Sequence, residues 1–129
     1  MNIDFYQCNI CGKFIGLMSD TIVPTVCCGQ TMNKVVPNTT DGAVEKHLPV
    51  YEIDGNKVYV RVGIMPHPMT EVHHISWIGL RTTHGFQFKE LEPDTEPEVK
   101  FSLCKKERVE AVYAFCNLHG LWCAEEEAK

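Results

Sequence analysis

The stretch "VYVRVGI", Val58 to Ile64, places an apolar residue at every second position. Period two is typical of a β-strand with one buried face, because successive side chains on a strand point to opposite sides. The same period recurs in "HISWIGL" (74–80), "FQFKEL" (86–91), "VKFSL" (99–103) and "VEAVYAF" (109–115). Turn residues separate neighbouring stretches, in "DGN" (54–56) and "HG" (84–85). The pattern predicts an all-β fold, an antiparallel β-sandwich of about seven short strands.

The cysteines divide the chain in two. Four of the seven lie within the first 28 residues, whereas residues 29–103 contain none. Between the two regions, "NKVVPNTTDGAVEKH" (33–47) carries Pro37 and a polar cluster that is typical of a connection. We therefore expect a small module over residues 1–36 and the β-sandwich over residues 37–129.

The composition restricts the class of protein. A chain of 129 residues forms one ordinary core, and its 44% apolar and 22% charged residues are values typical of a globular protein. No apolar run approaches the roughly 20 residues that cross a bilayer, so we expect a soluble protein without a membrane partner. A net charge of −5 argues against nucleic acid as a partner. The start "MNIDFYQC" lacks a secretory pattern, which predicts a cytoplasmic location, where cysteines serve metal or redox chemistry more often than disulfides.

The first four cysteines have the spacing of a metal site. Cys8 and Cys11 form a C-x-x-C pair, and the adjacent residues Cys27 and Cys28 follow after 15 further residues. A module of about 35 residues with few apolar side chains needs a staple, and four thiolates around one tetrahedral metal provide it. Two disulfides, or a thioredoxin-type C-x-x-C, are the alternatives, and the second lacks the expected βαβ context. Four cysteines suit both zinc and iron.

A second group of potential ligands is spread over the sandwich. The candidate histidines are His47, His67, one of the adjacent pair His73 and His74, and His119, which follows Cys116 in "CNLHGLW". Pro66 and Pro68 flank His67 and restrict its backbone. Adjacent residues of an extended segment point to opposite faces, so at most one of His73 and His74 can face a shared centre. The spacing alone does not choose between them.

Several centres could use these ligands. A closed structural zinc site needs four ligands, whereas this set offers five. A blue-copper site needs an axial methionine, and "GLWCAEEEAK" after His119 contains none. A cysteine–histidine nucleophile is a further alternative, although residues three apart in a tight turn are poorly placed for it. Four imidazoles and one thiolate would leave a sixth position open, an arrangement that suits iron.

A set of motifs extends over nearly the whole chain: "CNIC", "CCG", "EKH", "PHPM" with a histidine six residues later, "WI" and "CNLHGLW". Together they resemble the motifs of the desulfoferrodoxin family of two-iron superoxide reductases. The resemblance implies that residues 1–36 form a desulforedoxin- or rubredoxin-like knuckle, and that residues 37–129 form an immunoglobulin-like catalytic sandwich. It implies two irons per chain, with Cys8, Cys11, Cys27 and Cys28 holding the first. The implied ligands of the second are His47, His67, His73 and His119 in a plane and Cys116 along the axis.

The resemblance also implies an activity. Members of the family reduce superoxide to hydrogen peroxide with one electron, taken here from a rubredoxin-like donor, and so detoxify superoxide in the cytoplasm under oxidative stress. A homodimer is expected by the same resemblance. Glu45 and Lys46 match a loop over the open iron position, where the glutamate can bind resting iron and the lysine attracts the anion and helps to protonate it. A local cation is needed because the net charge of −5 repels superoxide weakly.

Two other functions compete with a superoxide reductase. The chain could carry electrons through the same two irons without reducing superoxide, or it could be a binding module stapled by zinc. Cys104 and Cys123 lie outside the ligand set that the family implies, and we expect them to be a strand-end thiol and a packed side chain. His84 lies in a predicted turn, where we expect it to be solvated.

Overall fold

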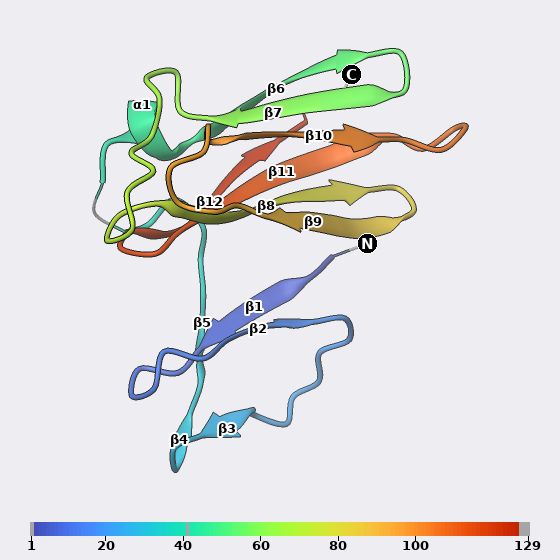
Figure 1. The fold of residues 1–129 in the computed structure, drawn as a ribbon. Coiled ribbons are helices and arrows are strands. Elements are labelled where there is room, and N and C mark those ends of the chain that lie inside the picture. The colour runs from blue at the N-terminus through green and yellow to red at the C-terminus, as the bar shows by residue number, and fades with distance from the viewer. Residues whose placement is uncertain (1, 41, 127–129) are drawn as a thin grey trace. The chain divides into compact units, whose positions relative to one another are not determined.

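The computed structural model describes residues 2–40 and 42–126, and its regular secondary structure consists almost entirely of antiparallel β-strands (Figure 1). Among these residues the sole helix is the single turn α1 (Val44–His47), so no helix described is long and apolar enough to cross a membrane. The chain divides into two compact units, Asn2–Val36 and the part that begins at Pro37. The all-β class predicted from the sequence is confirmed.

The first unit holds two small sheets. Its strands are β1 (Asp4–Gln7), β2 (Phe14–Leu17), β3 (Val26–Cys27), β4 (Gln30–Thr31) and β5 (Asn33–Lys34). Strands β2, β1 and β5 form one antiparallel sheet in that order, and β3 and β4 form a separate hairpin. Phe5 is buried and stacks on Phe14 with 5.5 Å between ring centroids, and Met32 is buried as well. Because so few apolar side chains are buried, the unit needs a cross-link to be stable.

The second unit is a sandwich of two sheets. Its strands are β6 (Pro49–Asp54), β7 (Lys57–Val62), β8 (Ile75–Thr82), β9 (Gly85–Glu90), β10 (Glu98–Ser102), β11 (Val109–Cys116) and β12 (Gly120–Glu125). One sheet has the order β10-β7-β6 and the other β12-β11-β8-β9. Val60 and Phe101 of the first sheet belong to the same buried cluster as Leu80 and Val112 of the second. The core therefore fills the space between the sheets.

The stretch that predicted the fold forms β7, with one difference. Val58, Val60 and Val62 are buried, as the alternation predicts, but the strand ends at Val62 rather than at Ile64. The cause is Gly63, whose φ of +85° lies outside the extended region and turns the chain out of the sheet. The predicted turns are confirmed, since Asp54 pairs with Lys57 and Thr82 pairs with Gly85.

The antiparallel order brings particular strand ends together. His47 precedes β6, His67 follows β7, His73 precedes β8, and Cys116 and His119 lie at the end of β11 and just before β12. In an antiparallel sheet the start of one strand lies beside the end of its neighbour. Consequently these five residues, which span more than 70 positions of sequence, all lie at one end of the sandwich.

Candidate metal centres

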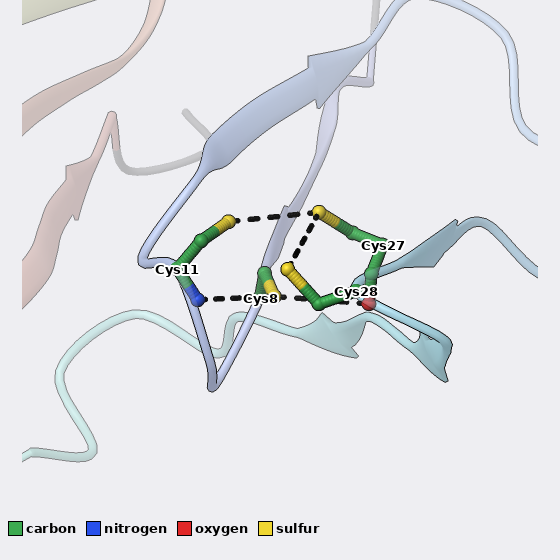
Figure 2. A group of neighbouring side chains, drawn as sticks. All are labelled: Cys8, Cys11, Cys27 and Cys28. Carbon is green, nitrogen blue, oxygen red and sulfur yellow. Dashed lines mark hydrogen bonds between the residues drawn. The ribbon is translucent and has the colours of Figure 1, made fainter.

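Four cysteine sulfurs of the first unit lie together (Figure 2). Cys8 and Cys11 come from the segment after β1, and Cys27 and Cys28 come from the β3–β4 hairpin. All four sulfurs lie within 4.8 Å of one another. The Sγ atoms of Cys11 and Cys27 are 3.6 Å apart and those of Cys27 and Cys28 are 4.0 Å apart, too far for a disulfide. Such spacing matches a tetrahedron of thiolates with metal–sulfur bonds of about 2.3 Å, whose edge is about 3.8 Å.

The backbone around Cys8 is shaped to stabilise its thiolate. The amides of Ile10 and Cys11 both donate to the Sγ of Cys8, each at 3.4 Å. Hydrogen bonds from the Cys11 and Ile10 amides lower the pKa of Cys8 to about 6. Cys28 itself has a φ of 53°, which lets two consecutive residues present their sulfurs to one point. The structure thus brings together the four cysteines that their spacing singled out as a metal site.

The second group of ligands contains five side chains. Donor atoms of His47, His67, His73 and Cys116 lie within 4.8 Å of one another. The fifth side chain is that of His119, whose Nδ1 lies 3.0 Å from Nε2 of His47 and 3.8 Å from Sγ of Cys116. The structure therefore brings together the four histidines and the cysteine singled out in the sequence.

The four imidazole rings follow one another around a square. The centroid distances between consecutive rings are 4.6 Å from His47 to His67, 4.7 Å from His67 to His73, 5.0 Å from His73 to His119 and 4.8 Å from His119 to His47. Each of these pairs meets edge to face, with interplanar angles of 75° to 89°. The diagonal from His47 to His73 is longer, at 6.2 Å. Four rings arranged in this way, with a sulfur beside them, offer five donors, which is one more than a closed tetrahedral site holds.

Hydrogen bonds at Nδ1 of His47 and of His67 orient the Nε2 atoms of these rings toward the group. Nδ1 of His47 lies 2.8 Å from the carbonyl oxygen of Ala43, and Nδ1 of His67 lies 2.6 Å from that of Pro68. Each Nδ1 therefore carries the proton, which leaves the lone pair of Nε2 directed toward the group. Among the described residues, the buried Nε2 atoms of His67 and His73 have no hydrogen-bond partner. Buried nitrogens of this kind fit a bound cation.

Burial keeps these rings neutral. It lowers the pKa of His47, His67 and His73, and it brings that of His67 to about 4. Neutral imidazole is the form that binds a metal. The backbone amide of His119 donates to Sγ of the buried Cys116 at 3.4 Å. The donor set thus fits a metal of intermediate softness.

The structure also chooses between the adjacent histidines. His73 belongs to the square, whereas the ring of His74 lies elsewhere, with Nδ1 3.0 Å from the carbonyl oxygen of Thr70 and 3.1 Å from that of Glu71. His74 therefore stabilises the turn before β8. The spacing left this choice open because both residues lie in one irregular segment.

Glu45 and Lys46 lie on α1, directly before His47. Both side chains are exposed, whereas His47 is buried. The positive charge of Lys46 adds to burial and to the neighbouring imidazoles in lowering the pKa of His47 and His73, so this charge acts on the centre. The carboxylate of Glu45 is not a member of the ligand group.

Trp122 supports two of the histidines, a role that sequence reasoning missed. Its ring stacks on His47, with 4.9 Å between centroids and 23° between planes, and its Nε1 donates to the carbonyl oxygen of His119 at 3.2 Å. The hydroxyl of Thr40 donates to the same carbonyl oxygen. The presence of tryptophan in "CNLHGLW" was a visible signal, but its contact with a residue 75 positions earlier could not be read from the sequence.

The remaining candidates lie outside both groups. Cys104 is exposed in the loop between β10 and β11, and Cys123 is buried on β12, where burial raises the pKa of its thiol. His84 lies exposed in the turn between β8 and β9. Each of the three lies where the sequence predicted, and none contributes to a metal site described here.

Comparisons with known proteins agree with this geometry. A family model described as Desulfoferrodoxin matches residues 39–125. A desulfoferrodoxin homolog of Archaeoglobus fulgidus is 44% identical over 117 residues, which cover 91% of this chain and 92% of the relative. The crystal structure of the superoxide reductase from Treponema pallidum matches with a TM-score of 0.80 and 38% identity, over 97% of this chain and all of that one. The one-iron superoxide reductase of Giardia intestinalis matches with a TM-score of 0.56 and 35% identity, over 65% of this chain and 99% of that one.

Proposed function

The chain belongs to the desulfoferrodoxin family, and we propose that it reduces superoxide to hydrogen peroxide at a non-haem iron. The observation that carries the proposal is the square of four imidazole rings with Sγ of Cys116 beside it. In the reaction, superoxide takes up one electron and two protons, and no dioxygen forms. The name of the Treponema protein, which matches over nearly the whole chain, supports this assignment.

The residues that would hold this iron are His47, His67, His73 and His119, through Nε2 of the first three and Nδ1 of the last, together with Sγ of Cys116. Iron held there would supply the electron and one open coordination position for the anion. The protein holds the nitrogens in place through the carbonyl oxygens of Ala43 and Pro68, so that little reorganisation is needed on binding.

Lys46 is proposed to attract the substrate. The whole molecule carries a charge of −5, so superoxide is weakly repelled at long range and a nearby cation must direct its approach. Lys46 is exposed and directly precedes the buried His47. The three N–H groups of its ammonium can donate to an anion. It can also hold a proton beside the product. Glu45 is proposed to bind the resting oxidised iron.

A second iron is proposed in the first unit, held by Cys8, Cys11, Cys27 and Cys28. Four sulfurs suit zinc as well as iron, and membership of the family favours iron. Its role would be to receive or store electrons from a rubredoxin-like donor. We infer that it is not required for the reaction, because 65% of this chain matches a complete superoxide reductase, that of Giardia.

We further propose that the protein acts in the cytoplasm as a homodimer, in the detoxification of superoxide. Support for association comes from the first unit, where Ile22 is fully exposed and Val23 is 71% exposed. Adjacent exposed apolar side chains contribute to a contiguous apolar patch, and such patches mark sites of association. Sedimentation of the iron-loaded protein tests the dimer, and a monomer at micromolar concentration would refute it.

The activity itself is tested by comparing the iron-loaded protein with Cys116→Ser. The wild-type protein should consume superoxide and show a thiolate-to-iron absorption band. Cys116→Ser should lose the band and the activity, while the absorption of the four-cysteine iron remains. Zinc at both sites in protein purified from cells grown with iron would contradict the proposal and favour a zinc-stapled module.

A further inference from the structure

We propose that Asn117 is a positioning residue that holds His73 in place relative to Cys116. The inference deepens the proposed function, since it concerns the same metal centre. Asn117 lies in the turn between β11 and β12, directly after Cys116, and its side chain is exposed. It does not belong to the ligand group, and its position in sequence gives no sign of a contact with residues 72–74.

Three hydrogen bonds join Asn117 to the segment that carries His73. Its backbone amide donates to the carbonyl oxygen of His74 at 3.1 Å. Its Oδ1 accepts from the backbone amide of His74 at 2.8 Å, and its Nδ2 donates to the carbonyl oxygen of Val72 at 3.0 Å. One residue thus bonds to the backbone on both sides of His73.

The side chain of Asn117 extends the hydrogen-bonded pairing of β11 and β8 beyond the point where the two backbones pair. Strands β11 and β8 pair as far as Cys116 and Ile75, with a register shift between Phe115 and Cys116. In an antiparallel ladder, opposed residues can exchange two bonds between backbone groups. Here Asn117 donates with its own amide but accepts with Oδ1, so the side-chain oxygen replaces a backbone carbonyl. Nδ2 of Asn117 then donates to the carbonyl oxygen of Val72, and an ionised carboxylate at this position would lack that donor.

The bonds from Asn117 attach the segment around His73 to the end of β11. The backbone of His73 is bonded within its own turn, since its amide donates to Oγ1 of Thr70 at 3.1 Å and its carbonyl oxygen accepts from the amide of Thr70 at 2.9 Å. These bonds shape the turn but do not fix it to a strand. The bonds from Asn117 tie the turn to the end of β11, where Cys116 supplies the sulfur. Nε2 of His73 is buried and has no hydrogen-bond partner among the described residues, so its place depends on the backbone behind it.

The test measures metal binding rather than activity alone. Cobalt(II) is titrated into the metal-free full-length protein against a competing chelator, and the visible absorption is followed. The two centres differ in thiolate number, so their charge-transfer bands differ, and the four-cysteine centre serves as an internal reference. The variants are Asn117→Leu, which loses both side-chain bonds, and Asn117→Asp, which keeps the acceptor and loses the donor. The matched control is Leu118→Ala, whose side chain is 60% exposed in the same turn.

We expect Asn117→Leu to weaken cobalt binding at the histidine–cysteine centre by about tenfold or more and to shift its charge-transfer band, because supporting residues of metal ligands have effects of this size. Asn117→Asp should also shift the band, and it decides the matter if Asn117→Leu fails to fold. Leu118→Ala should bind cobalt as the wild-type protein does. In every variant, the bands of the four-cysteine centre and the melting temperature of the metal-free protein should stay near their wild-type values.

Wild-type affinity and band positions in the Asn117 variants would overturn the inference. So would equal weakening at both centres with a lower melting temperature, since that is general destabilisation. A wild-type protein that shows no band from a one-thiolate centre would instead refute the proposed function itself.

Discussion

At the scale of single residues, the chemistry depends on which groups are charged. Lys46 is exposed next to the buried His47, and it is the residue that we expect to direct superoxide. Lys46→Ala should slow the capture of superoxide by up to about tenfold and should reduce the dependence of the rate on ionic strength, because a local attraction is lost. Stopped-flow mixing at several salt concentrations measures both effects.

The control for Lys46→Ala is Lys105→Ala. It removes the same charge from an exposed loop between β10 and β11, so it changes the net charge equally without changing the field at the centre. Lys46→Arg should restore most of the rate. An equal loss of rate in Lys46→Ala and Lys105→Ala would show that net charge, not position, determines capture.

The buried histidines predict how the metal-free protein responds to acid. The folded-state pKa of His67 is lowered by burial to about 4, whereas the unfolded value is near 6.5. Between these values the unfolded chain binds more protons than the folded chain, so the free energy of unfolding must fall as pH is lowered from about 6.5 to about 4. Urea unfolding of the metal-free protein at several pH values measures this.

His67→Gln is the matched variant for the acid experiment. It keeps a neutral polar side chain but removes the titrating group, so its stability should fall less between pH 6.5 and pH 4. A wild-type protein with constant stability over this range would contradict the burial of a neutral imidazole at this position.

At the scale of elements, Gly63 lies directly after β7 and packs closely against the backbone of α1. A Cβ atom at Gly63 would lie closer than 3.0 Å to the carbonyl oxygens of Glu45, Lys46 and Met65, and its φ is +85°. Gly63→Ala should therefore displace α1, slow superoxide capture through the displaced Lys46, and lower the free energy of unfolding by more than the roughly 1–2 kcal/mol of backbone strain alone.

Gly55→Ala separates the clash from the strain. Gly55 has a φ of +60° in the turn between β6 and β7, and a Cβ atom there would meet nothing within 4 Å. This variant should lose stability through strain but should capture superoxide at the wild-type rate. Equal effects of Gly63→Ala and Gly55→Ala on capture would show that the contact with α1 does not position Lys46.

The alternation in Val58–Ile64 was sufficient to predict a sandwich strand because each buried valine follows from the period alone. The end of that strand was misjudged, because the apolar alternation continues to Ile64 and the period does not reveal the positive φ of Gly63. The choice of His73 over His74 came from resemblance rather than from spacing. The supporting roles of Trp122 and Asn117 were not predicted, because both depend on contacts between segments distant in sequence.

At the scale of the whole molecule, two compact units each hold one group of ligands. Cys8→Ser should remove the iron proposed for the first unit and destabilise that unit, which buries few apolar side chains. The second unit has its own core and all five ligands of its centre, so reduction of superoxide by chemically reduced protein should continue at a similar rate. Iron analysis and stopped-flow kinetics measure the two outcomes.

The same variant tests the role proposed for the first iron. Reduction of the catalytic iron by a rubredoxin-like donor should be slower in Cys8→Ser if electrons pass through the four-cysteine centre. Complete loss of superoxide reduction in chemically reduced Cys8→Ser would contradict the independence of the two units.

The most direct test of superoxide reduction at this centre is to mix the fully reduced, iron-loaded protein with superoxide and to measure hydrogen peroxide and dioxygen together. The structure and the family predict one peroxide for each superoxide consumed, with oxidation of the histidine–cysteine iron and no dioxygen produced by the protein. Peroxide and dioxygen in equal amounts would indicate a dismutase. Superoxide that disappears no faster than in buffer would indicate a carrier of electrons, and either result would contradict the proposed function.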